Sequence, residues 1–98
     1  MTMVLHTLNA SPSSAAFADC LRLIAPGDSL LLLGDAVYGA LAGSVGGQAL
    51  RDCGASLYLL REDAAAAGVT DRVDGATLID MDGFVELTER CARQLAWY

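Results

Sequence analysis

Four consecutive leucines, at positions 30–33, constrain the fold more than any other feature of the sequence. Gly27-Asp28 precedes the run and Gly34-Asp35 follows it. A short apolar run without polar alternation predicts a strand that is buried on both faces, as in parallel sheets covered by helices. In such folds ligands or partners are usually met at the loop after a central strand. Residues 34–38 are therefore the first place to look for a functional site.

The rest of the chain alternates predicted strands and helices. The first strand is expected over residues 4–8 and the first helix over 13–24, with Ser11 as its N-cap and Pro12 in its first turn. The later predicted elements are a short helix over 36–41, a helix over 48–53 ended by Gly54, a strand over 56–60, a helix over 62–67 ended by Gly68, a strand over 77–79, and a helix over 83–94 capped by Asp82 with Leu95 on its inward face.

This order predicts one domain over residues 1–98 with a three-layer α/β/α fold. The sheet is expected to be mostly parallel, with four to five strands and right-handed crossovers. The last four residues, 95–98, are apolar, and this composition predicts that the tail docks on a surface rather than frays.

Composition narrows the possible partners. The chain is 54% hydrophobic, yet no apolar run approaches the roughly 20 residues that span a bilayer, and no signal peptide is indicated. The surplus apolar surface indicates burial against other subunits. The net charge is −6, lysine is absent and the six arginines are scattered, which argues against direct binding of nucleic acid. The acidity either provides solubility or matches a basic partner.

The cysteines and glycines match no cofactor motif. Cys20, Cys53 and Cys91 lack metal-binding spacing, so we expect no metal, no disulfide and reduced thiols in a cytoplasmic protein. Neither a phosphate-binding loop with its lysine nor a dinucleotide-binding glycine pattern occurs, so no cofactor is expected.

Few residues are candidates for chemistry. His6, the single imidazole, is either hydrogen-bonded in the core, a subunit contact or a proton relay. Cys20 falls on the apolar face of the first predicted helix, which favours a packed thiol over a reactive one. Asp35 either caps a helix or lines a pocket, and Tyr38 suits an interface.

The sequence resembles the DsrH/TusB family of small sulfur-relay proteins along essentially its whole length. The resemblance rests on an ordered set of short matches: 5–9 with Ser11-Pro12, 27–33 with Asp35 and Val37-Tyr38, 57–60 with Glu62-Asp63, Ala67-Gly68, Ile79-Asp80, 83–88, Gln94 and Ala96-Trp97.

The resemblance implies one subunit of a cytoplasmic sulfurtransferase complex. Its partners would be DsrF/TusC-like and DsrE/TusD-like subunits in a dimer of heterotrimers that passes persulfide sulfur between carrier proteins. The sulfur would end in 2-thiouridine at the wobble position of tRNA. The main persulfide cysteine of such a complex lies in the DsrE/TusD-like subunit, which makes this chain an accessory or non-catalytic subunit.

The resemblance also implies specific residues. Some members of the family carry a cysteine in the first helix, which makes Cys20 a candidate secondary sulfur carrier and opposes the burial argument. The expected contact residues are His6, Asp35, Tyr38, Trp97 and Tyr98. Three alternatives remain open: a sulfur-oxidation relay in which Cys20 carries sulfur, a self-assembling homo-oligomer without sulfur chemistry, and a stand-alone thiol enzyme.

Overall fold

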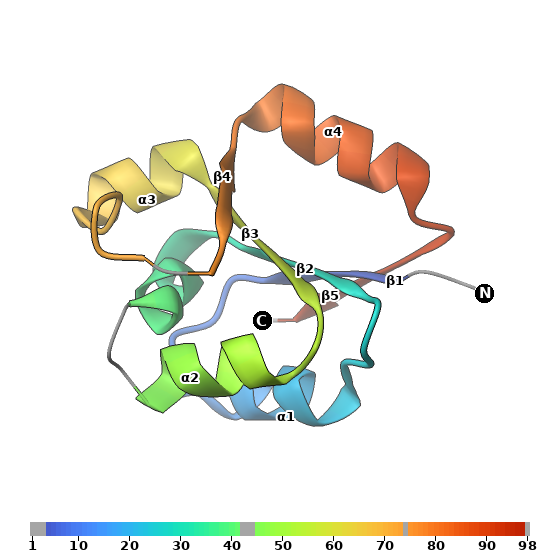
Figure 1. Cartoon of the computed structure of the whole chain (residues 1–98), viewed down its shortest axis with the longest axis horizontal. Helices are drawn as coiled ribbons and strands as arrows, with labels where there is room; N and C mark the ends of the chain where they lie inside the picture. The colour runs from blue at the N-terminus through green and yellow to red at the C-terminus, as the bar shows by residue number, and fades with distance from the viewer. Residues whose placement is uncertain (1–3, 42–44, 74, 98) are drawn as a thin grey trace.

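A computed structural model describes residues 4–41, 45–73 and 75–97. Its centre is a five-stranded sheet in the order β4-β3-β2-β1-β5, and every neighbouring pair of strands is parallel (Figure 1). The strands are β1 (Val4–Leu8), β2 (Ser29–Leu32), β3 (Ser56–Leu60), β4 (Thr77–Ile79) and β5 (Arg93–Trp97). The helices are α1 (Ala15–Leu23), the 3₁₀ helix η1 (Gly34–Ala40), α2 (Val45–Asp52), α3 (Arg61–Ala67) and α4 (Met81–Arg90).

The first three residues of the leucine run, Leu30–Leu32, lie in β2, the central strand of this sheet, and Leu33 follows as the half-buried N-cap residue of η1. All four residues of β2 are buried, and β2 pairs with β1 on one side and β3 on the other. Leu30 and Leu32 point into one core while Leu31 points into a second core on the opposite face. The interpretation of the run as a strand buried on both faces is confirmed, and so is the parallel α/β fold.

The two cores follow from the order of the strands. The chain steps from β1 through β4 in one direction, and right-handed crossovers then place α1 and α2 on the same face of the sheet. The return to β5 on the far side of β1 places α4 on the opposite face (Figure 1). The larger core lies under α1, α2 and η1, and the smaller one lies under α4 around Leu5, Leu31 and Leu87.

Both predicted N-caps are wrong by two or three residues. Ser14, not Ser11, caps α1, because its hydroxyl accepts from the backbone N–H of Phe17 at 3.2 Å. Asp80, not Asp82, caps α4 by accepting from the N–H of Gly83 at 2.9 Å. In each case several capping residue types lie close together, and composition alone does not choose among them.

The predicted C-terminal helix is wrong at its end. α4 stops at Arg90 with Cys91 extended, and residues 93–97, expected partly as helix, form β5 along β1. Leu95, placed on the inward helical face by its spacing, is 43% exposed on this edge strand. The strand gains backbone hydrogen bonds to β1, a long-range interaction that the local apolar pattern does not contain. The tail does dock, as expected, up to Trp97; Tyr98 lies outside the described residues.

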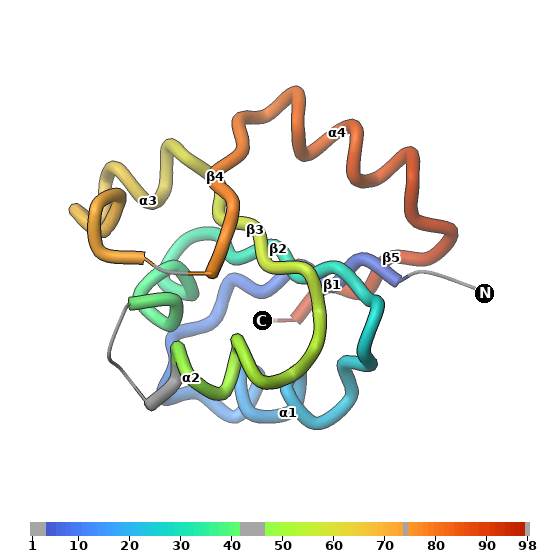
Figure 2. The backbone as a smooth tube through the Cα atoms, viewed as in Figure 1, coloured from blue at the N-terminus to red at the C-terminus, as the bar shows by residue number. Residues whose placement is uncertain are grey.

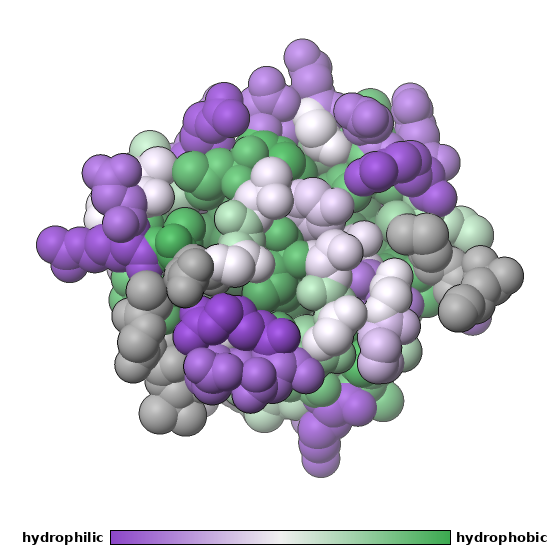
Figure 3. Space-filling model, viewed as in Figure 1, coloured by the Kyte–Doolittle hydropathy of each residue, from purple (hydrophilic) through white to green (hydrophobic). Residues whose placement is uncertain are grey.

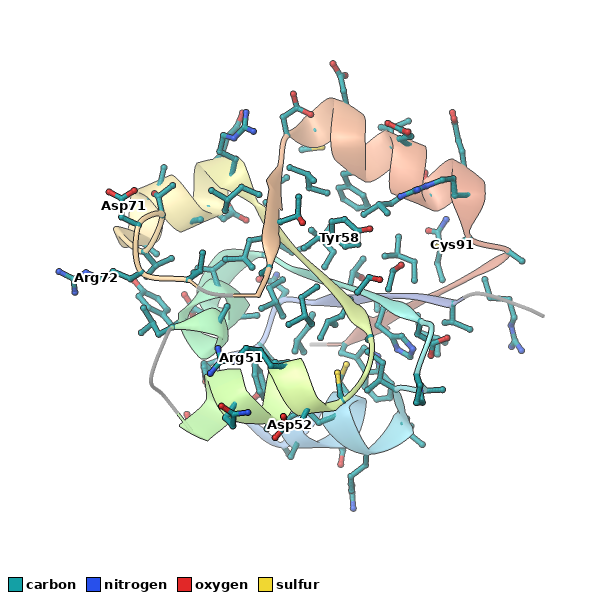
Figure 4. The ribbon with its side chains drawn as sticks, viewed as in Figure 1. Arg51, Asp52, Tyr58, Asp71, Arg72 and Cys91 are labelled. Atoms are coloured by element: carbon teal, nitrogen blue, oxygen red, sulfur yellow. The ribbon has the colours of Figure 1, made fainter. Side chains whose placement is uncertain are left out.

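The C-terminal strand β5 runs beside β1, so the first and last strands of the chain are neighbours in the sheet (Figure 2). In the view of Figure 3, apolar surface crosses the middle of the molecule between polar side chains on α2 and on the upper helices. On the face that α4 covers, Tyr58 lies between β3 and that helix (Figure 4). None of the described helices is long and apolar enough to cross a membrane.

Candidate functional site

A buried polar chain links three distant parts of the sequence. His6, on β1, is 2% exposed, and its Nε2 lies 3.0 Å from Oδ2 of Asp28. On the other side of the ring, the indole Nε1–H of Trp97 donates to Nδ1 of His6 at 3.1 Å. The two rings lie 18° from parallel, with their centroids 6.3 Å apart.

Asp28 is the acceptor on which this chain ends. It is 7% exposed, and besides His6 it accepts from the backbone N–H of Ala25 at 3.0 Å and that of Val4 at 3.4 Å. Burial alone would raise the pKa of Asp28. The hydrogen bonds from Ala25, His6 and Val4 outweigh burial, so the pKa is lowered. Asp28 is therefore a carboxylate that ties the start of β1 to the turn before β2.

These contacts define the protonation of His6. An ionised carboxylate only accepts hydrogen bonds, so Nε2 carries a proton. An indole N–H only donates, so Nδ1 carries none. The network thus assigns His6 as the neutral Nε2–H tautomer with both ring nitrogens satisfied inside the chain.

The three thiols are free and differ in access. Cys20 is 0% exposed on α1, and burial, with a smaller contribution from nearby Cys53, raises its pKa to about 12. Cys91, at the end of α4, is 6% exposed in the smaller core (Figure 4). Cys53 is half-buried, and its Sγ–H donates to the carbonyl of Leu50 at 2.9 Å. In this conformation Cys20 is a packed thiol, and its burial opposes formation of the nucleophilic thiolate.

An open cavity of about 260 Å³ lies where the sequence predicted the site. The residues that line it belong to η1 and α3, the helices that follow the carboxyl ends of β2 and β3. They are Gly34, Asp35, Tyr38, Asp63, Ala66 and Ala67. The backbone N–H of Gly34 donates to Oδ2 of Asp63 at 2.8 Å, which joins the two ends. Tyr38 is 44% exposed at this site. The cavity offers two carboxyl groups and a phenol, and its lining among the described residues includes no thiol or imidazole.

The predicted site residues separate into two groups. Asp35 and Tyr38 line the cavity, whereas His6 and Trp97 bond to each other in a different part of the structure. The sequence analysis did not predict Asp28 or Asp63 as site residues. One feature of the sequence could have pointed to Asp28. A single buried histidine needs a hydrogen-bond acceptor, and Asp28 stands just before the neighbouring strand. In the described part of the chain no group of three or more potential ligands is placed to hold a metal ion.

The fold and the site define a small three-layer α/β protein with a fully parallel sheet and an open cavity at the carboxyl edge of that sheet. In three dimensions the chain is similar to the crystal structure of the ychN protein from E. coli, with a TM-score of 0.74. That likeness covers 98% of this chain and 99% of the other, at 16% identity, and it shows the fold alone.

The sequence comparisons identify the family. Residues 10–94 match the family model described as DsrH like protein. The chain is 42% identical to Protein TusB of Escherichia coli O1:K1 / APEC over 95 residues, which is 96% of this chain and all of that one. The same identity and coverage hold for Protein TusB of Shigella sonnei (strain Ss046). The chain belongs to the DsrH/TusB family.

Proposed function

We propose that this chain, acting as one DsrH/TusB-like domain over residues 1–98, is an accessory subunit of a cytoplasmic sulfur-relay complex. DsrF/TusC-like and DsrE/TusD-like subunits are its partners, and the complex passes persulfide sulfur toward 2-thiouridine at the tRNA wobble position. Family membership along the whole chain supports the relay. The observation that carries the accessory role is the burial of Cys20, whose pKa of about 12 leaves almost no thiolate to accept sulfur.

The cavity between η1 and α3 supports a docking role for this end of the sheet. Asp35 and Tyr38 line it, and exposed tyrosines are common anchors in protein interfaces. We assign these two residues to the contact with a partner subunit. Trp97, which is partly exposed at the end of β5, is a further candidate.

Co-expression with both partner subunits, followed by native mass measurement, tests the assembly. Tyr38→Arg should reduce recovery of the complex. Val85→Arg is the matched control, because Val85 is 51% exposed on α4 and does not line the cavity. A chain that binds neither partner would refute the proposal, and equal losses in both variants would refute the assignment of the contact.

A second experiment tests the accessory role. The folded chain is treated with a persulfide donor and its intact mass is measured, with Cys20→Ser in parallel. We expect no sulfur adduct on Cys20. An added sulfur atom that disappears in Cys20→Ser would make Cys20 a carrier and support the sulfur-oxidation type of relay instead.

Expression of the chain in a bacterium lacking its own TusB should restore 2-thiouridine in tRNA.

A further inference from the structure

We propose that Trp97, His6 and Asp28 form a pH-operated latch on the C-terminal strand, in which a proton on Nδ1 of His6 releases the Trp97 side chain. The proton comes from solvent, and no covalent bond other than N–H is made. This device concerns the conformation of the chain and does not depend on the proposed sulfur relay.

The latch follows from the donors and acceptors around the ring. In the neutral state Trp97 donates to Nδ1 at 3.1 Å and His6 donates to Asp28 at 3.0 Å. Protonation turns both ring nitrogens into donors. The indole N–H and the new Nδ1–H would then face each other at 3.1 Å, a repulsive arrangement, while the imidazolium still bonds to the Asp28 carboxylate. The ring stays in place and the indole must move.

The other ionisable groups on the elements that pack against β1 do not replace this response. Asp28 remains ionised because its pKa is lowered. From α1, Cys20 stays a thiol, with its pKa near 12. Also on α1, Asp19 and Arg22 pair with each other on the exposed side of the helix. On β5, Arg93 is exposed and pairs in register with Val4, at the opposite end of the strand from Trp97.

The carboxyl end of β5, which carries Trp97, is a part of the sheet that can detach without disrupting the central strands. β5 is an edge strand, and four of its five residues are exposed. Trp97 is the residue of β5 that packs against the larger core. Edge strands present unpaired backbone groups, so their ends are sensitive to the loss of a side-chain anchor. Releasing Trp97 removes the side-chain hydrogen bond that holds the carboxyl end of β5 to β1.

The sequence makes this proposal unusually easy to test, because it contains one histidine and one tryptophan. NMR of the full chain between pH 8 and pH 5 follows the His6 ring protons and the Trp97 indole N–H in one sample. We expect both to titrate with the same midpoint, with faster exchange of the indole proton and a change in tryptophan fluorescence on the acidic side. In His6→Gln, which keeps a donor toward Asp28 and cannot be protonated, the fluorescence step should be lost.

Trp97→Phe supplies an independent test that does not rely on a histidine variant. It keeps an aromatic ring and removes the donor that favours neutral His6, so the His6 midpoint should rise by roughly half to one pH unit. Three results would overturn the latch: a tryptophan signal that stays constant while His6 titrates, an unchanged or lowered midpoint in Trp97→Phe, or a histidine that stays neutral until the chain unfolds. The same fluorescence step in His6→Gln would assign it to carboxylates and also refute the latch.

Discussion

Replacing Gly39 by alanine should destabilise the chain through a steric clash rather than through backbone strain. Gly39 is buried in η1, and its φ does not lie in the left-handed region, so its backbone accepts a side chain. A Cβ at this position would lie 2.7 Å from both Cε2 and Cζ of Phe17. Carbon atoms pack best at about 3.5–4.0 Å, so two ring atoms are overlapped by roughly 1 Å.

The magnitude depends on whether Phe17 can move. Its ring is 3% exposed in the larger core, with α1 behind it, and offers little room to yield. Overpacking of this kind costs about 1–3 kcal/mol in the free energy of unfolding. For a domain of this size each kcal/mol lowers the melting temperature by about 4–8 °C. Denaturant titration, followed by the fluorescence of the single tryptophan, measures the loss.

Two comparisons isolate the cause. Gly68→Ala is the matched control, because Gly68 has φ +73° and nothing within 4 Å of a Cβ; its cost of about 1–2 kcal/mol is backbone strain alone. Shortening the ring with Phe17→Leu should rescue Gly39→Ala, so the double variant is more stable than the sum of the single losses predicts. Additive losses, or a Gly39→Ala variant as stable as the original chain, would refute the steric argument.

Three further predictions concern buried polar and thiol groups. Asp28→Asn should lower the free energy of unfolding at pH 7 by about 1–3 kcal/mol. Because the folded pKa of Asp28 is below its usual 3.8, this contribution is present above about pH 4 and is lost as the pH falls through the folded pKa; a gap between the two chains that does not narrow on acidification would contradict the assignment. Iodoacetamide at pH 8 should modify Cys53 first and spare Cys20 until denaturant is added, as read by peptide mass spectrometry; equal rates would contradict the burial argument. Asp80→Ala should cost about 1 kcal/mol and Asp82→Ala a few tenths, and the reverse order in thermal unfolding would disprove the N-cap at Asp80.

Local sequence rules were sufficient for most of the sheet. β1, β3 and β4 have the predicted bounds, because each is a short apolar run between turn residues. Gly68 ends α3 in the left-handed conformation with φ 73°, as its position after an alanine-rich helix predicted. These features depend on neighbours within one or two turns of the chain, which is the range that periodicity and capping rules describe.

The site was less accessible to such rules. The loop over residues 34–38 was singled out because parallel sheets usually meet ligands or partners after a central strand, and the structure places a cavity there. The contact of Asp63 with that loop was not predicted, because its hydrogen bond to Gly34 joins residues that are 29 positions apart in the sequence. The bond between Trp97 and His6 spans 91 positions. No local pattern encodes a contact of that separation, and the apolar spacing of Leu95 instead favoured a longer helix.

Counting the hydrogen-bond partners that a buried histidine needs could still have corrected the predicted structure of the C-terminal tail. A histidine on a strand that is covered on both sides must find a partner for each ring nitrogen, because an unpaired buried nitrogen costs about 1–3 kcal/mol. Asp28 supplies one partner from the turn before β2. With residues 93–97 as part of a helix, Nδ1 would lack the indole N–H that binds it. The strand β5 thus supplies a hydrogen-bond donor as well as packing to the core, through Trp97. His6, the residue that requires this donor, lies at the other end of the sequence.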